Sequence, residues 1–323
     1  MNGSMMLRRM HAKLGAGLLV MLLGASAAAQ PVQPRPVMPQ QVSPSAWFVQ
    51  GEAALGSPAN RNFISNAGFV VTPAGVVVID ALGSPALARL LLEGLAKVTS
   101  KPVTHVVLTH YHADHIYGLQ EFRRRGAKIL AHRGGLDYLN SETATNRLQA
   151  SREELAPWID AQTQLVAPDE WLDGPRDLVL GGVTLQLRPV GPAHTPGDLV
   201  VFLPSEKVLF AGDIVFRGRV PFVGQADSRH WIAALDQLLT MEAQVVVPGH
   251  GGLSTQPRAD LQLTRDYLAY LRESMGAAAR DMEPFDEAYA RTDWSRFEAM
   301  PLFRAANRMN AYNTYLLMER QVR

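Results

Sequence analysis

The chain has 323 residues, of which 47% are hydrophobic, and its 31 basic and 30 acidic residues leave a formal net charge of +1. This length supports one large domain with a sizeable core, and the near-neutral balance favours neither a nucleic-acid nor an anionic-membrane partner. The chain has no cysteine, which excludes disulfides, thiolate metal ligands, a thiol nucleophile and a lipid-modified cysteine anchor.

The N-terminal segment has the pattern of an export signal. It begins with a basic region that contains Arg8, Arg9 and Lys13. An apolar stretch over 14–23, too short to span a bilayer, leads to three alanines at 27–29. We therefore expect residues 1–29 to be a signal peptide and the mature protein to be periplasmic, with no stable membrane anchor after cleavage. An uncleaved anchor is the rival interpretation, and the Arg8-Arg9 pair leaves twin-arginine export open.

Composition also predicts the domain boundaries. Residues 30–45 are rich in Pro and Gln and are typical of a mobile linker. Alternating strands and helices predict one domain over 46–256. Residues 257–323 are predominantly helical, and we expect them to pack on the same domain as a C-terminal extension.

Strands and helices alternate through the first half of this domain, which indicates an α/β layered arrangement. Apolar runs separated by turn residues predict strands at 47–56, 63–71, 76–79, 101–108 and 128–131. Leucines at helical spacing after Ser84-Pro85 predict a helix, and a short helix ends near Gly126. Residues 135–168 are more polar and are expected to be helical.

The second half has a different pattern, with hairpins first and a strand–helix–strand unit after them. A hairpin is expected over 179–185, through the turn Gly181-Gly182. The later elements are strands at 199–203 and 208–210, a helix at 230–239 and a strand at 245–247.

The residues that follow strand 101–108 concentrate metal-ligating groups. His110, His112, Asp114 and His115 fall within six residues. Packed together without a metal, these histidines would repel one another when protonated. Imidazole and carboxylate without a thiol form a ligand set for zinc, or for non-haem iron or manganese.

Three later positions repeat the pattern of an apolar run followed by a metal-capable side chain. They are His194, Asp213 and His250, and each stands beside Gly, Pro or Thr residues that permit tight turns. Side chains at the ends of strands gather at one edge of a sheet. Together with His110, these strand ends predict a single metal centre.

These motifs resemble the metallo-β-lactamase superfamily of hydrolases, over about residues 63–251. The resemblance rests on the 110–115 motif, His194-Thr195-Pro196-Gly197, Gly212-Asp213 and Pro248-Gly249-His250-Gly251. It implies an α/β fold of four layers, the αβ/βα sandwich, with two sheets face to face, helices outside and metals at one edge. Within the superfamily, Asp213 resembles the bridging carboxylate of glyoxalase II-like members. The run 193–224 is similar to exported SoxH-type hydrolases.

The resemblance also implies two zinc ions per chain, with iron as a possible substitute. The first ion would be held by His110, His112 and His194, and the second by Asp114, His115 and His250. Asp213 and a hydroxide would bridge the two ions. Asp114 is the expected catalytic residue, because it can orient the nucleophile or shuttle its proton. The implied reaction is hydrolysis of an ester, thioester or amide carbonyl of a small-molecule substrate.

Other activities stay open at this point. Persulfide dioxygenases share the fold and a similar His-X-His-X-Asp-His segment, but they use one iron and oxygen chemistry. A β-lactamase proper fits the expected export and the His194 motif. A zinc-holding binding module is the non-enzymatic alternative, although the open positions of the implied sites favour catalysis. The protein partners and the oligomeric state are not indicated.

Several residues near the motifs need separate interpretations. We expect His105 and His132 to be packing residues and His230 to lie on the surface. Asp80 is either a carboxylate that accepts the second N–H of a ligating histidine or a helix N-terminal carboxylate.

Loop arginines and nearby tyrosines are candidates for substrate contacts. Arg217 and Arg219 are either solvated or a clamp for a substrate carboxylate or sulfonate. Tyr111 and Tyr117 flank the motif and are candidates to line the pocket.

Overall fold

The computed structural model describes residues 36–322. The expected signal peptide, with His11, and the first part of the expected linker lie outside the described residues. Among the helices of residues 36–322, none combines the length and the apolar character needed to cross a membrane.

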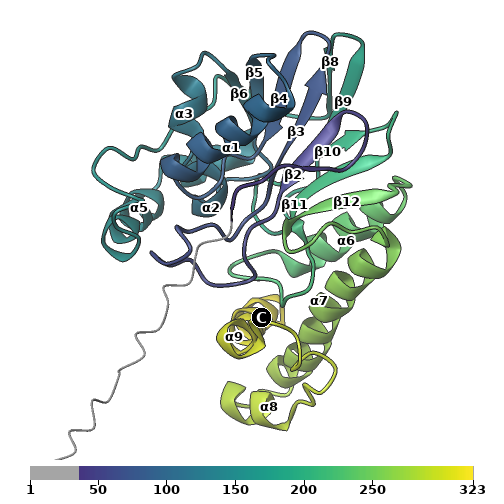
Figure 1. Ribbon diagram of the computed structural model, residues 1–323. Coiled ribbons are helices and arrows are strands. Elements are labelled where there is room, and N and C mark those ends of the chain that lie inside the picture. Colours follow the sequence, from purple (N-terminus) through teal and green to yellow (C-terminus); the bar gives the residue numbers. More distant parts are fainter. Residues whose placement is uncertain (1–35, 323) are drawn as a thin grey trace, which may run out of the picture. The chain divides into compact units, whose positions relative to one another are not determined.

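Two β-sheets form the centre of the described chain (Figure 1). The first has seven strands in chain order: β1 (Gln40–Gln41), β2 (Ala46–Val49), β3 (Ala67–Thr72), β4 (Gly75–Ile79), β5 (Val103–Val107), β6 (Lys128–His132) and β7 (Glu170–Leu172). Strands β1 to β4 pair antiparallel, and β4 to β7 pair parallel. The parallel pairs place the C-terminal ends of β4, β5 and β6 at one edge, where β5 leads into the metal motif.

The second sheet has five strands in the order β12 (Val245–His250), β11 (Val208–Phe216), β10 (Leu199–Leu203), β9 (Val183–Pro189) and β8 (Arg176–Leu180). Strands β8 to β11 pair antiparallel, and β11 pairs parallel with β12. Gly181 and Gly182 form the expected turn between β8 and β9, both with positive φ. The parallel pair brings the ends of β11 and β12 to the same edge.

Helices cover the outer face of each sheet (Figure 1). The apolar cluster on the first sheet includes residues of α1 (Pro85–Val98), α2 (Ala113–Ile116), α3 (Leu119–Arg123) and α5 (Glu142–Glu154). The cluster on the second sheet includes residues of α6 (Ser228–Leu239), α7 (Pro257–Arg280), α8 (Phe285–Arg291) and α9 (Phe303–Val322). Ser84 caps α1 by accepting a hydrogen bond from the Leu87 N–H, as its place before Pro85 predicts.

A third apolar cluster lies between the two sheets. Phe48, Val70 and Val107 of the first sheet pack with Val201 and Phe210 of the second. The order of layers is therefore helices, sheet, sheet, helices, which confirms the predicted αβ/βα sandwich with helices at its C-terminal end. Phe210 sits so close to Gly68 that a Cβ there would lie 2.2 Å from its ring.

The structure differs from the sequence-based expectation in several places. Within the expected linker 30–45, Val37 is buried and β1 pairs with β2, so this part belongs to the folded unit. A Pro/Gln-rich composition does not prevent two residues from adding to a sheet edge. Strand β7 was not expected, because its three residues are too few to show a period. Strand β11 continues beyond residue 210, and η1 (Arg133–Gly135) and α4 (Leu136–Leu139) add two short turns of helix.

We predict that Phe210→Ala lowers the free energy of unfolding by about 3–5 kcal/mol, because it leaves a cavity between the sheets. Urea unfolding followed by circular dichroism measures this change. Val179→Ala is the control, since Val179 is 62% exposed on β8 and should change stability by less than about 0.5 kcal/mol. An equal effect of the two substitutions would contradict the assignment of Phe210 to the core.

Candidate metal centre

Seven histidine and aspartate side chains from both sheets meet at one edge of the sandwich. They form two groups in which the ligand atoms lie within 4.8 Å of one another: His110, His112, His194 and Asp213 in the first, and Asp114, His115 and His250 in the second. These are the seven residues singled out from the sequence. The six expected to hold one ion each fall into the expected two groups, and Asp213, which was expected to bridge them, falls in the first. The loop after β5 and helix α2 supply four of them, the β9–β10 loop supplies His194, and β11 and β12 supply Asp213 and His250.

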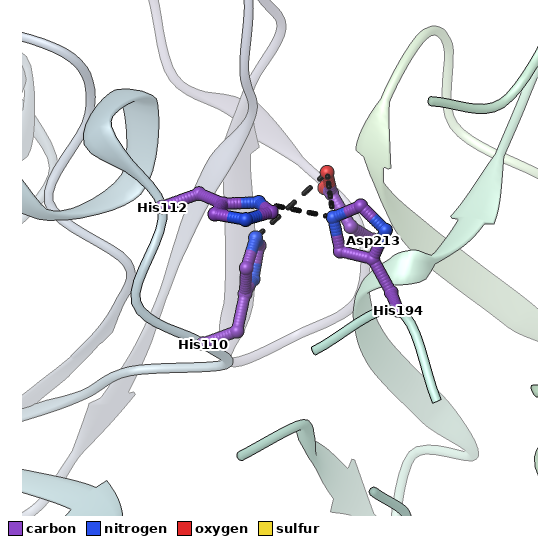
Figure 2. A group of neighbouring side chains, drawn as sticks. All are labelled: His110, His112, His194 and Asp213. Carbon is purple, nitrogen blue, oxygen red and sulfur yellow. Dashed lines mark hydrogen bonds and ion pairs between the residues drawn. The ribbon is translucent and has the colours of Figure 1, made fainter. Parts of the chain in front are cut away.

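The first group turns its polar atoms toward a common point (Figure 2). The Nε2 atom of His194 lies 3.0 Å from the Nδ1 atom of His112 and 3.4 Å from Asp213 Oδ2. The Nε2 atom of His110 lies 3.8 Å from the same carboxylate oxygen. Three ring nitrogens and one oxygen therefore face a small shared space, as the ligands of one cation do.

The second group is built around Asp114 and also reaches Asp213. The Nε2 atom of His250 lies 3.2 Å from Asp114 Oδ2 and 3.3 Å from Asp213 Oδ2. The Nε2 atom of His115 lies 3.6 Å from Asp114 Oδ2 and 3.2 Å from Asp213 Oδ1. Because its oxygens face histidines of both groups, the Asp213 carboxylate stands between them.

Asp213 does not end its strand, which corrects the expectation from the sequence. It lies inside β11, where the register with β12 breaks on both sides of Gly212. Gly212 has a φ of +52°, and this bulge interrupts the ladder next to Asp213. On β12, a Cβ at Gly249 would lie 2.0 Å from Asp213 Oδ1, so the carboxylate occupies space that only glycine leaves free.

The electrostatics of the two groups differ. Burial lowers the pKa of His110 well below its ordinary value and lowers the pKa of His194 to about 3. Burial also acts to lower the pKa of His115, but the charges of Asp114, Asp213 and Asp80 outweigh burial and raise this pKa. The first group therefore presents neutral imidazoles, the form that binds a metal.

Several buried polar atoms of this cluster have no hydrogen-bond partner. They include Nε2 of His110, Nε2 of His115 and Oδ1 of Asp213. Buried polar atoms without partners are costly, and these point at one another from converging side chains. A cation in each group would supply the missing interaction, and imidazole with carboxylate suits zinc or iron. The residues therefore fit a pair of metal ions.

Comparison with known proteins agrees with this geometry. The sequence model of the family described as the Metallo-beta-lactamase superfamily matches residues 60–250 of this chain. The chain belongs to the metallo-beta-lactamase superfamily. It is 30% identical over 216 residues to a metallo-beta-lactamase type 2 of Bacillus sp. (strain 170), a match that covers 65% of this chain and 75% of that protein. It is 25% identical over 241 residues to a linear primary-alkylsulfatase of Pseudomonas sp. (strain ATCC 19151), covering 63% of this chain and 45% of that protein.

Solved structures of the superfamily share the fold. A stereoselective inverting sec-alkylsulfatase from Pseudomonas sp. matches with a TM-score of 0.70 at 19% identity, over 87% of this chain and 50% of that one. A metallo-beta-lactamase from Pontibacter korlensis matches with a TM-score of 0.56 at 24% identity, over 72% of this chain and 98% of that one. The chain thus spans about half the length of the alkylsulfatases it matches. The β-lactamase and alkylsulfatase relatives named here are hydrolases of this superfamily.

Hydrogen bonds to the Nδ1 atoms of three ligand-group histidines fix the orientation of their rings. Asp80 accepts a hydrogen bond at 2.9 Å from Nδ1 of His115, and two more from the N–H and hydroxyl of Thr109. That hydroxyl lies 3.0 Å from Nδ1 of His110, and Ile64 O accepts from Nδ1 of His250 at 2.7 Å. A ring that donates through Nδ1 presents the lone pair of Nε2 to a metal.

Asp80 therefore has the first of its two predicted roles, that of the carboxylate behind a ligating histidine. Ser84, and not Asp80, caps α1. The backbone of Asp80 has a φ of +62°, an unusual conformation for a non-glycine residue. Its position at the end of β4, beside β5, is the signal by which the sequence indicated this role.

The remaining histidines lie where the sequence placed them. His105 is half-buried in β5 and contacts Thr104. His132 accepts a hydrogen bond from the Gly134 N–H at the start of η1. His230 is exposed in the first turn of α6 and pairs with Asp227.

Two other interpretations change with the structure. Tyr111 and Tyr117 do not line the site, since both are buried in the apolar cluster of the first sheet and Tyr111 donates to Val166 O. Tyr138, which the sequence did not indicate, is a neighbour of the site: its ring centroid is 6.5 Å from that of His112. Tyr138 was missed because it lies on a four-residue helix, α4, that leaves no recognisable period.

The two loop arginines have different surroundings. Arg217 donates to Asp260 at 2.8 Å, so its guanidinium already has a carboxylate partner. Arg219 is only 5% exposed, and its Nη1 lies 3.4 Å from Nδ1 of His250. Within residues 36–322 no carboxylate lies within ion-pair distance of Arg219, and its Nε donates to the backbone oxygen of Val220 at 3.4 Å. Burial lowers the pKa of Arg219.

We predict that Asp80→Asn weakens zinc binding by about 10- to 100-fold, because the carboxylate that orients His115 is lost. Zinc content after dialysis against buffered free zinc measures the effect. Asp227→Asn is the matched control, since Asp227 pairs at 2.8 Å with His230, an exposed histidine that is not one of the seven ligands. Wild-type zinc affinity in Asp80→Asn would show that this contact does not support the site.

Proposed function

We propose that this protein is a dinuclear zinc hydrolase that cleaves an ester, thioester or amide bond of a small substrate. The observation that carries the proposal is the Asp213 carboxylate, which faces His194 of one ligand group and His115 of the other. A shared carboxylate lowers the repulsion between two neighbouring cations, and such pairs are typical of hydrolytic sites.

Zinc bound at both groups would acidify a water toward neutral pH and polarise the bond that is cleaved. The chain itself determines from which side a substrate approaches. Of the seven residues, only His112 and Asp114 are half-buried, whereas the other five are buried. A substrate therefore reaches the site beside His112 and Asp114, with Tyr138 near the same opening.

Asp114 is the residue best placed to handle the proton of the attacking water. Its side chain is 17% exposed, and its Oδ2 lies 3.2 Å from Nε2 of His250. Burial raises the pKa of Asp114, but the nearby His115 and His250 outweigh this and hold its pKa well below the usual range. Asp114 therefore stays ionised and can orient a water and accept its proton.

The proposal predicts that metal removal abolishes activity. Dialysis against a chelator should leave an inactive protein, because the nucleophile in this mechanism is a water that the metal ions activate and not a serine or cysteine side chain. Two zinc equivalents per chain, measured by atomic emission, should restore activity on a panel of thioesters, lactones, alkyl sulfates and a cephalosporin. Asp114→Ala should lower kcat by at least about 100-fold.

Three outcomes would contradict this function. Full activity of the metal-free protein would remove the mechanism. One iron per chain with oxygen uptake would support the persulfide dioxygenase alternative instead. An Asp114→Ala substitution that leaves the phenotype of the producing cell unchanged would favour a zinc-binding module.

β-Lactam hydrolysis is the second candidate, and the 30% identity to a metallo-beta-lactamase type 2 supports it. If a cephalosporin is turned over faster than every ester in the panel, β-lactam hydrolysis becomes the favoured function. Export is part of both proposals, because the N-terminal pattern is that of a signal peptide. Fractionation of the producing cell and N-terminal sequencing should give a periplasmic chain that begins at Gln30.

We also propose that the substrate is an anion. Arg219 is a buried guanidinium next to His250. Asp213 and Asp114 act on its charge from a distance, but no carboxylate among the described residues lies within ion-pair distance of it, and a buried charge without a direct partner is costly. A carboxylate or sulfate group of the substrate would supply that partner. The alkylsulfatase relative, whose name implies an anionic ester as substrate, supports the same class.

Arg219→Met should therefore raise KM for an anionic ester by about tenfold or more, while KM for a neutral ester of the same acid stays within about twofold. Arg217→Met is the matched control, since Arg217 is paired with Asp260. Equal changes for the anionic and the neutral ester would contradict the anion preference without touching the metal mechanism.

A further inference from the structure

The turn before β3, Ile64-Ser65-Asn66, contacts the second ligand group from both of its sides. Asp114 comes from helix α2 on the first sheet, and His250 comes from the last position of β12 on the second sheet. The two ligands are 136 positions apart along the chain, yet the same three-residue turn touches both. From the sequence we expected residues 63–66 to be part of a strand, but β3 begins only at Ala67.

Ile64 and Ser65 each hold one of these ligands. Ile64 O accepts from Nδ1 of His250 at 2.7 Å, which turns Nε2 of this histidine toward the two carboxylates. The Ser65 hydroxyl donates to the backbone oxygen of Asp114 at 2.5 Å, and Ser65 is completely buried. The bond from Ser65 fixes the first turn of α2 at the residue that carries the carboxylate.

Asn66 joins the turn to the backbone around His250. Its N–H donates to Gly249 O at 2.7 Å, and its side-chain amide donates to Pro248 O at 2.8 Å and to Gly251 O at 2.9 Å. These bonds bracket His250 on both sides. Its Oδ1 accepts from the Gly51 N–H at 3.0 Å, so Asn66 has both its amide and its carbonyl in use.

The first ligand group has no such support from the turn. His110 contacts the Thr109 hydroxyl, and neither His112 nor His194 has a hydrogen bond to residues 64–66 within the described chain. The third ligand of the second group, His115, is held by Asp80 instead. The turn therefore acts on two of the three residues that belong to the second group alone.

We propose that Ile64-Ser65-Asn66 is a positioning turn that sets the affinity for the second metal ion and not for the first. Ordering two ligands from different sheets costs conformational entropy, and the turn orders them before the ion binds. A chain that loses these contacts keeps its first metal and binds the second more weakly. This inference rests on the dinuclear site of the proposed function.

Ser65→Ala tests the proposal with a small change in volume. The full chain is stripped of metal and equilibrated with buffered free zinc, and bound zinc per chain is measured by atomic emission. We expect the dissociation constant of the second equivalent to rise by about tenfold or more, and that of the first to stay within about twofold. Asn66→Asp, which replaces the donating amide with an oxygen that faces two carbonyl oxygens, should raise this dissociation constant further. Ser65→Thr keeps the hydroxyl and should bind the second equivalent as the wild type does.

Ser254→Ala is the matched control. Ser254 is as buried as Ser65 and donates an equally short hydrogen bond of 2.5 Å, but its acceptor is Asp260, which belongs to neither ligand group. It should bind both equivalents as the wild type does. Thermal unfolding of each metal-free variant separates loss of the site from loss of the fold.

The outcomes separate this inference from the function on which it rests. Wild-type affinity for both equivalents in Ser65→Ala would overturn the positioning role, and so would an equal loss at both sites in a folded chain. A wild-type chain that holds a single ion would overturn the dinuclear function, and the inference with it.

Discussion

The position of one carboxylate, Asp213, is the constraint on which the rest of the site depends. In the proposed dinuclear site, two cations a few ångströms apart would repel strongly, so a negative group must lie between them. The chain meets this demand with a bulge at Gly212, which breaks the register of β11, and with Gly249, which leaves room beside the carboxylate. The cost of the interrupted ladder is local, because β11 pairs on both sides with buried neighbours.

Around that carboxylate, the histidines are oriented by a separate layer of contacts. Asp80, Thr109 and Ile64 each occupy the Nδ1 side of a ligating ring, so three Nε2 atoms face inward without rearrangement. Such preorganisation matters because a hydrolytic site works only if its groups are in place before the substrate binds. The fold contributes the strand ends, and these contacts contribute the direction of each ring.

The sequence indicated most of this from a few residues. The spacing of the 110–115 motif, and the glycines and prolines beside His194 and His250, were enough to predict which side chains converge. Asp80 was predictable because it ends an apolar strand directly before the metal strand. The alternation of strands and helices indicated an α/β layered arrangement, and the resemblance to the superfamily implied the two facing sheets, which the third apolar cluster confirms.

The rest could not be predicted, because it depends on contacts between residues far apart in the chain. Tyr111 and Tyr117 flank the motif in sequence, yet the packing of α2 and its neighbours buries them. Arg217 and Arg219 are two positions apart, but only the three-dimensional arrangement pairs the first with Asp260 and leaves the second beside His250. The turn at 64–66 carries no recognisable motif. Its Ser65 and Asn66 side chains bond to backbone oxygens, which every residue type offers, so no partner residue type marks these contacts in the sequence.

The division of ligands between the two sheets has a thermodynamic consequence. Each ligand group draws on side chains from both halves of the sandwich, so an ion bound there would bind the docked sheets and not the separated ones. By linkage, ligand binding to the native state alone adds stability that grows with the logarithm of free ligand over its dissociation constant. The concentration of free zinc would then set the stability of the interface between the sheets around Phe210. A lack of zinc would destabilise the sandwich as well as abolish the proposed activity.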